Sequence, residues 1–324
     1  MNKKFMPGFG LKNRHIQTLY SSLFRKLPLL EIEIESFPLS DGDFLECHWH
    51  NKPQKDSNTP IITLFHGLAG SYKSPYIQGL MSEAKRNNFA TVLMHFRGCS
   101  GKENTLPRSY HSGDSGDALS WIKELSRRYP NSKLFGVGYS LGGNMLLKLL
   151  GEKGKDSPLN AAVSVSAPLQ LDICADAMNR GFSKFYQHIL LKDLNLSLEK
   201  KFDRHDMSKF IEIKKEDVKN LKTFWEFDGA YTAPVHGFKS AQDYYTRSSS
   251  KQFLKSIETP TLIIHSKDDP FMTQEILPSK EELSKTVTLE LSANGGHVGF
   301  IGGTFFNPDY WLEKRVVSFF KTYL

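Results

Sequence analysis

The sequence predicts an α/β fold in which helices cover a mostly parallel β-sheet. Continuous apolar runs at residues 61–65, 90–94 and 161–165 are typical of strands that are buried on both faces. Segments with apolar residues at helical spacing, such as 114–128, separate these runs. Buried strands that alternate with amphipathic helices indicate βαβ units, which build parallel sheets. We therefore expect one α/β core.

The remaining core elements follow in order along the chain. Residues 31–35 alternate between polar and apolar, residues 44–49 do so more loosely, and a turn at 41–43 joins them, so an antiparallel hairpin comes first. A helix over 75–86 lies between the first two buried strands. A short strand from residue 133 leads into a helix that opens at residue 141. Strands at 261–265 and 287–291 and a helix over 310–323 complete the core.

Residues 168–238 interrupt this alternation with helical patterns and no strand. One predicted helix carries Phe182, Phe185, Tyr186, Ile189 and Leu190, and another helix, or a pair, covers 210–225. Both ends of the segment should emerge at the carboxyl edge of the sheet, where open α/β sheets bind ligands. We divide the chain into a basic N-terminal arm (1–30), an α/β core (31–167 and 239–324) and a helical cap insertion (168–238).

Composition narrows the class of protein. The 324 residues are 39% hydrophobic and 24% charged, which are the values of a globular protein. The sequence contains neither an apolar run long enough to span a membrane nor a secretory signal. Cys47, Cys99 and Cys174 are too few and too irregularly spaced for a disulfide framework or a zinc site. These features predict a cytoplasmic protein.

The positive charge is concentrated in the arm. Residues 1–30 hold six basic residues, including Lys3 and Arg14, and no acidic ones, whereas the other 294 residues have 36 basic against 35 acidic. A nucleic-acid-binding protein would show a basic face across a whole domain, so we do not expect nucleic acid as a partner. The arm also contains apolar residues, and two roles stay open for it. It could contact an anionic membrane surface peripherally, or lie as a strap over the core.

One motif joins a strand, a tight turn and a helix around a serine, Gly138-Tyr139-Ser140-Leu141-Gly142. This G-x-S-x-G order is that of a nucleophile elbow, in which the serine hydroxyl points out of a strained turn. A serine attacks poorly unless a neighbouring base accepts its proton. An acid and a histidine should therefore follow Ser140, each in a loop after a strand.

Both partners are present in that order. Strand 261–265 is followed by Asp268 and Asp269, and strand 287–291 is followed by a glycine-rich loop with His297. We expect Asp269 to orient the histidine and Asp268 to belong to the turn. We expect little to back the glycine-rich loop, so that the imidazole can reach Ser140. The sequence thus predicts a catalytic triad of Ser140, Asp269 and His297.

Acyl transfer also needs two fixed N–H donors that bind the oxygen of the tetrahedral intermediate. The residue after the nucleophile, Leu141, supplies one at the start of a helix. The loop after the first buried strand, residues 66–70, supplies the other from Leu68. We expect His66 to brace this loop, and Arg97 and Cys99 to fix the loop beside it.

Other chemistries are disfavoured. His15, His95, His111 and His236 have no metal-ligand spacing to one another or to carboxylates, and the phosphate-binding motif G-x-x-x-x-G-K-[ST] is absent. The sequence therefore predicts neither a metal nor a cofactor. Cys99 is not expected to act as a nucleophile because no elbow surrounds it.

Several motifs together resemble one known family, the YheT branch of the α/β-hydrolases, bacterial esterases related to eukaryotic ABHD-type membrane lipases. The matching segments lie around residues 13–18, 66–71, 94–101, 138–145, 265–271 and 295–300, and the resemblance covers nearly the whole chain. It implies the α/β-hydrolase fold and hydrolysis of small-molecule esters by Ser140, Asp269 and His297. The same acyl-enzyme could pass its acyl group to an alcohol or thiol, so an acyltransferase remains an alternative, as does a catalytically idle binding protein.

The cap should determine which substrate is accepted. A helical segment over Ser140 has more large apolar residues than a thin cap can bury, including Phe182, Phe185, Tyr186, Phe224 and Trp225. Some of them should line an apolar pocket for an acyl chain. We therefore expect short- to medium-chain acyl esters as substrates, acylglycerols among the candidates.

Overall fold

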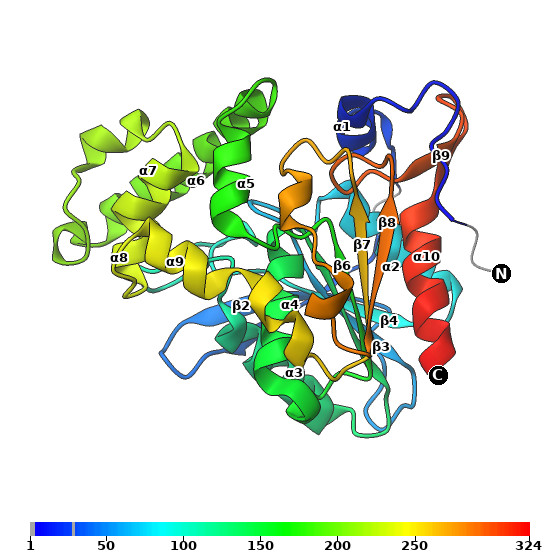
Figure 1. Cartoon of the computed structure of the whole chain (residues 1–324). Coiled ribbons are helices and arrows are strands. Elements are labelled where there is room, and N and C mark those ends of the chain that lie inside the picture. Colours follow the sequence, from blue (N-terminus) through cyan, green and yellow to red (C-terminus); the bar gives the residue numbers. More distant parts are fainter. Residues whose placement is uncertain (1–3, 28–29) are drawn as a thin grey trace.

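A computed structural model describes residues 4–27 and 30–324 (Figure 1). An eight-stranded sheet with the strand order β1-β2-β4-β3-β5-β6-β7-β8 forms its centre. In this sheet β2 pairs antiparallel with both β1 and β4, and the other strand pairs of the sheet are parallel. The strands are β1 (Glu33–Pro38), β2 (Phe44–His50), β3 (Ile61–Phe65), β4 (Ala90–Met94), β5 (Leu134–Tyr139), β6 (Ala161–Val165), β7 (Thr261–Ser266) and β8 (Val287–Ser292).

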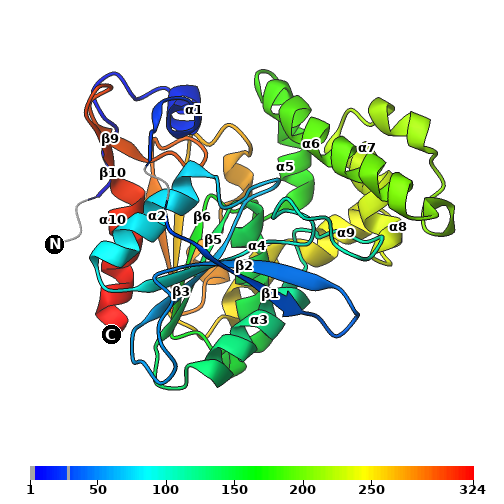
Figure 2. The ribbon, with the colours of Figure 1, turned by 180° about the vertical axis from the view of Figure 1, so that it is seen from behind.

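Helices cover both faces of this sheet. Helices α2 and α10 lie on one face, and α3 and α4 lie on the other (Figures 1 and 2). The parallel strands β3, β4, β5 and β6 are buried along their whole length, which explains their unbroken apolar sequences. The helices are α2 (Pro75–Arg86), α3 (Ser115–Arg128), α4 (Leu141–Lys153) and α10 (Trp311–Phe320).

The regular elements described between β6 and β7 are all helices, and those from α5 to α9 form a lobe beside the sheet (Figure 1). The predicted cap boundaries at 168 and 238 stay a prediction. No strand marks the second boundary in the described chain, because helices continue after residue 238 up to Ser256. The lobe contains α5 (Leu171–Met178), α6 (Ser183–Arg204), the 3₁₀ turns η2 (Met207–Lys209) and η3 (Lys215–Asn220), α7 (Phe224–Phe227), the π-helix η4 (Asp228–Thr232), α8 (Ala233–Val235) and α9 (Ala241–Ser248). The 3₁₀ helix η5 (Ser250–Ser256) follows and packs against α4 in the core.

The expected helix or pair of helices over 210–225 was wrong. The segment contains one 3₁₀ helix, η3, between irregular residues, and α7 begins only at Phe224. Its apolar residues Ile211, Val218 and Leu221 pack in one cluster with Leu191 and Leu198 of α6. Burial against α6 therefore holds this segment without a regular helix.

The N-terminal arm forms a helix, α1 (Arg14–Phe24), that lies at the carboxyl edge of the sheet (Figure 1). Before it, Gly8 and Phe9 donate backbone hydrogen bonds to the carbonyls of Ile301 and Gly303 in β9 (Ile301–Gly303), which pairs with β10 (Pro308–Tyr310). After it, Arg25 forms an ion pair of 2.5 Å with Glu313 of α10. The described residues of the arm therefore lie as a strap over the core, which is one of the two roles left open for it. Lys3 lies outside the described residues.

Candidate active site

Ser140 lies in a sharp turn between β5 and α4, with φ 50° and ψ −117°. The flanking glycines make this turn feasible. A Cβ on Gly138 would lie 2.3 Å from the carbonyl oxygen of Gly142, and one on Gly142 would lie 2.5 Å from the carbonyl oxygens of Phe65 and His66. The strained serine backbone is therefore held by close packing of β5, α4 and β3.

A chain of two hydrogen bonds joins the three residues that the sequence singled out. His297 Nε2 lies 3.0 Å from Ser140 Oγ, and His297 Nδ1 lies 2.8 Å from Asp269 Oδ2. Asp269 is buried, and its second oxygen accepts a hydrogen bond of 2.9 Å from the Phe271 N–H. The carboxylate accepts the Nδ1 proton, so the Nε2 lone pair faces the serine hydroxyl. The arrangement allows His297 to take the Ser140 proton.

The neighbouring Asp268 has different partners. Its two oxygens accept hydrogen bonds from the Gly296 N–H at 3.0 Å and from Asn294 Nδ2 at 3.3 Å. Both donors belong to the loop that carries His297. Asp268 therefore holds the loop, while Asp269 contacts the imidazole.

The two expected N–H donors lie next to the serine. Leu141 is the first residue of α4, Leu68 follows Gly67 in the loop after β3, and both line the same cavity as Ser140. In the described part of the chain, neither backbone N–H has a hydrogen-bond partner. The two N–H groups are thus available to an oxyanion, and this role stays a prediction.

His66 braces the loop that contains Leu68. Its Nδ1–H donates to the Gly67 carbonyl at 2.7 Å, and its Nε2 accepts the Phe96 N–H at 3.1 Å. Burial lowers the pKa of His66 to about 4. The imidazole therefore stays neutral and connects the loops after β3 and β4.

The loop after β4 is fixed by Arg97. Its guanidinium binds both oxygens of Asp117, at 2.6 and 2.8 Å, and also contacts Asp41 and Asp43. This connects the loop to α3 and to the β1–β2 hairpin. Desolvation raises the pKa of the nearby Cys99 thiol to about 12, so a thiolate nucleophile is disfavoured there.

A mostly apolar cavity of about 500 Å³ adjoins Ser140 and His297. Tyr186, Leu190 and Leu194 of α6 line it at intervals of four residues, as the inner face of a helix should. Of the residues from which we expected some to line it, Phe182 and Phe185 do not, and they are 52% and 51% exposed. Phe182 precedes α6, and Phe185 lies a quarter turn away from the inner face.

Phe224 lines the cavity as expected, and Trp225 does not. The Trp225 indole N–H donates to Asp176 at 2.8 Å on the surface of the lobe. Residues of the arm complete the wall: Thr18, Leu19, Ser21 and Ser22 of α1. The arm was not expected at the site, although the glycines of the His297 loop and the family-like segment at residues 13–18 are sequence signals for this packing.

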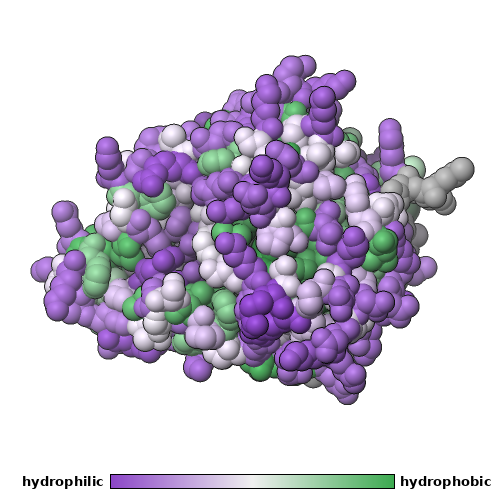
Figure 3. All heavy atoms as spheres, turned by 90° about the horizontal axis from the view of Figure 1, so that it is seen from below, coloured by the Kyte–Doolittle hydropathy of each residue, from purple (hydrophilic) through white to green (hydrophobic). Residues whose placement is uncertain are grey.

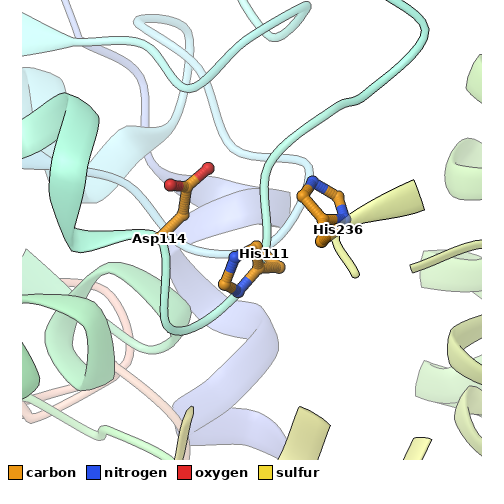
Figure 4. A group of neighbouring side chains, drawn as sticks. All are labelled: His111, Asp114 and His236. Atoms are coloured by element: carbon orange, nitrogen blue, oxygen red, sulfur yellow. The ribbon is translucent and has the colours of Figure 1, made fainter. Parts of the chain in front are cut away.

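Figure 4 shows a second group of polar side chains, His111, Asp114 and His236. Their potential ligand atoms lie within 4.8 Å of one another. Their sequence spacing did not indicate this proximity, because the cap brings His236 to a core loop that is distant in sequence. Asp114 already accepts a 2.6 Å hydrogen bond from Arg108. Burial, then His236 and nearby cationic side chains, lowers the pKa of His111 well below its usual value. The positive charges of Arg108, Lys148 and Arg247 near His111 disfavour the binding of a metal cation at this group.

Comparisons with known proteins agree with this architecture. The sequence model of the alpha/beta hydrolase fold matches residues 60–304. The chain belongs to the α/β-hydrolase family. The predicted fold class is thereby confirmed, with its antiparallel start and mostly parallel sheet.

Relatives within the family agree with the resemblance seen in the sequence. The Escherichia coli protein named "Putative esterase YheT" is 42% identical over 321 residues, which cover 99% of this chain and 94% of that protein. The Bos taurus protein "Phospholipase ABHD3" is 28% identical, and the match covers 94% of this chain and 74% of the relative. The resemblance to the YheT branch is therefore confirmed.

A solved structure shares the fold of this α/β-hydrolase. The Pyrococcus furiosus esterase Pf2001 matches with a TM-score of 0.59 and 17% identity over 99% of both chains. Within residues 4–27 and 30–324, no helix has both the length and the apolar character needed to cross a membrane.

Proposed function

We propose that this α/β-hydrolase cleaves carboxylic esters through an acyl-Ser140 intermediate. The observation that carries the proposal is the hydrogen-bonded chain from Asp269 through His297 to Ser140, with distances of 2.8 and 3.0 Å. The esterase names of a relative and of a structural neighbour support the same reaction class.

In the first half of the reaction, Ser140 Oγ attacks the ester carbonyl carbon while His297 Nε2 accepts the hydroxyl proton. The N–H groups of Leu68 and Leu141 bind the resulting oxyanion. The intermediate then collapses, the bond to the alkoxide breaks, and His297 returns the proton to the leaving alcohol. Asp269 holds the imidazole in the required tautomer throughout.

In the second half, a water molecule takes the place of the alcohol. His297 accepts a proton from it while its oxygen attacks the acyl carbon. The second tetrahedral intermediate then collapses, the bond to Ser140 Oγ breaks, His297 returns the proton to that oxygen, and the carboxylic acid leaves. An alcohol or thiol in place of water would yield a new ester or thioester. The same geometry thus serves the acyltransferase alternative, and product analysis separates the two.

The apolar cavity supports medium-chain acyl groups as substrates, and acylglycerols are included in this class. Its volume of about 500 Å³ and its leucine-rich wall suit an alkyl chain. Each methylene that leaves water there contributes up to ~0.8 kcal/mol to binding.

A fluorophosphonate probe tests the proposal, because only a serine activated by a base attacks phosphorus readily. We expect mass spectrometry to find the adduct on Ser140 alone, and Ser140→Ala to lose ester turnover. Turnover is measured on esters of increasing chain length, with and without added alcohol. An adduct on another serine, or full turnover by the variant, contradicts the proposal.

We further propose that the cavity opens toward an anionic membrane surface with which the protein makes peripheral contact. On the α1 side of the cavity, Leu23 and Phe24 are 67% and 54% exposed, and Phe182 and Phe185 are exposed on the α6 side. Basic Arg14 lies on α1. The face seen from below in Figure 3, away from α1, is mainly hydrophilic.

Vesicle sedimentation tests this contact. We expect binding to vesicles of phosphatidylglycerol at low salt, a decrease at high salt, and little binding to neutral phosphatidylcholine. Leu23→Ser with Phe24→Ser should weaken binding and leave turnover of a water-soluble ester intact. Equal sedimentation with both kinds of vesicle, or none with either, contradicts the proposal.

A further inference from the structure

The N-terminal helix α1 packs directly against the loop that carries His297. A Cβ on Gly296, which has φ +57°, would lie 2.5 Å from the carbonyl oxygen of Arg14 and 2.7 Å from Thr18 Oγ1. A Cβ on Gly299 would lie 2.3 Å from the carbonyl oxygen of Gln17. The expectation that little backs this loop was wrong, because its glycines allow the helix to approach the loop backbone.

The contact reaches His297 itself through Thr18. Thr18 Oγ1 accepts the backbone N–H of His297 at 2.9 Å and donates its own proton to the Arg14 carbonyl at 2.8 Å. The hydroxyl is therefore oriented by its own helix, with a lone pair directed at the His297 N–H. This bond spans 279 residues of sequence and joins the arm to the residue proposed as the base.

Gln17 holds the rest of the loop to the same helix. Its fully buried amide donates to the carbonyls of Leu11 at 2.7 Å and Ile301 at 3.0 Å, and its oxygen accepts the Ile301 N–H at 2.7 Å. All three bonds lie within the interior. They keep α1 at a constant distance from the chain that follows His297.

The core holds other atoms of the loop. Ser166 Oγ accepts the Val298 N–H at 3.1 Å, and Ser266 Oγ donates to the Gly296 carbonyl at 2.7 Å. Val298 and Phe300 have φ values of 59° and 49°, a backbone conformation that is unfavourable for residues other than glycine. A loop with such a backbone persists only where its surroundings hold it, and α1 provides the contact at His297.

We propose that Thr18 is a positioning residue for ester hydrolysis, which fixes the backbone of His297 so that its imidazole stays between Asp269 and Ser140. The inference rests on the proposed function, in which His297 moves the proton. Displacement of a reacting group by 1 Å can lower a rate by about 100-fold, so a modest shift of the loop would suffice.

The test compares three single variants on a water-soluble ester. Thr18→Val keeps the shape of the side chain and leaves the His297 N–H without its acceptor. Thr18→Ser keeps the hydroxyl. Tyr20→Phe removes another hydroxyl from the inner face of α1, one that donates to the Phe305 carbonyl away from His297. It controls for a general loosening of the helix.

We expect Thr18→Val to lower kcat by ~10- to 100-fold with KM nearly unchanged, because the loss concerns alignment in the transition state. Thr18→Ser should restore most of kcat, and Tyr20→Phe should retain it. A kcat of Thr18→Val equal to that of the wild type overturns the proposal. An equal decrease in Tyr20→Phe also overturns it, because the effect would then come from loosening of α1.

A measurement without turnover separates this inference from the proposed function. The quantity to measure is the NMR resonance of the His297 Nδ1 proton in the resting protein. We expect its resonance to shift or broaden in Thr18→Val and to stay unchanged in Thr18→Ser and Tyr20→Phe. An unchanged resonance in Thr18→Val overturns the positioning role. Full turnover by Ser140→Ala contradicts the proposed function alone.

Discussion

The imidazole of His297 lies face to face with the phenyl ring of Phe271, with ring centroids 4.0 Å apart and ring planes 9° apart. The same Phe271 donates its backbone N–H to Asp269, and its ring contacts Tyr186 of the cap at 5.0 Å between centroids. One residue thus contacts the proposed base, its carboxylate partner and the wall of the cavity.

Phe271→Leu should lower kcat/KM for a soluble ester by about 3- to 10-fold, because aromatic contacts of this kind contribute ~0.5–1.5 kcal/mol. Phe271→Tyr keeps the ring and should stay near the wild-type value. Steady-state kinetics of both variants measure this. Equal losses in the two would show that the stacked ring is not the cause.

Asp269→Asn should lower kcat by about 10³- to 10⁴-fold, because an amide at this position no longer selects the tautomer with a free Nε2 lone pair. Asp268→Asn is the matched control. Its remaining carbonyl oxygen can still accept the Gly296 N–H, so we expect a small loss of thermal stability and little loss of kcat. A more damaging Asp268→Asn would mean that the wrong carboxylate has been assigned.

The inner face of α6 should set the preferred acyl length. Leu194→Ala enlarges the cavity, so kcat/KM should shift toward longer acyl chains while acetyl ester turnover stays nearly constant. Phe185→Ala removes an exposed side chain of the same helix and should leave the profile unchanged. Kinetics on a series of p-nitrophenyl esters measure the profile. A profile that peaks at acetate in all variants would show that the cavity does not hold the acyl chain.

Asp228 should make the stability of the cap depend on pH. Burial raises its pKa from 3.8 to about 6, although the Thr232 and Tyr245 hydroxyls donate to it at 2.6 and 2.7 Å. Because the folded state binds the proton more tightly, this contribution to stability is present below pH 4 and is lost as the pH rises through 6. The difference between these two pKa values corresponds to ~3 kcal/mol in the free energy of unfolding.

Melting temperatures between pH 4 and 8 test this coupling. The wild type should lose stability relative to Asp228→Asn between pH 4 and 6 and then remain parallel to it. Asp193→Asn, at an exposed position of α6, should follow the wild type at every pH. A constant difference between the wild type and Asp228→Asn across this range would show that Asp228 does not titrate there.

Local sequence predicted the sheet well because its signals are strong and short in range. Strands such as 61–65 and 90–94 lie where their apolar runs occur, and α2 spans Pro75–Arg86 as expected. The first hairpin strand was placed at 31–35, whereas β1 spans Glu33–Pro38. As an edge strand it is largely exposed, so its apolar pattern marks its ends poorly.

The sequence also determined which residues meet at the proposed site. Parallel strands end at one edge of a sheet, so residues directly after β5, β7 and β8 had to lie near one another. The positions of Ser140, Asp269 and His297 after these strands therefore predict that the three side chains lie together. Their roles stay predictions, and the distances between them are what the structure adds.

Only the tertiary structure decided which surfaces meet across long sequence separations. Packing between segments more than a hundred residues apart determines the approach of His236 to His111 and the bond from Thr18 to His297. It also determines which face of α6 points inward. A helical pattern shows that one face is apolar without showing what covers it. A hydroxyl such as that of Thr18 has no pattern at all, so its partner is determined only when two backbones come into contact.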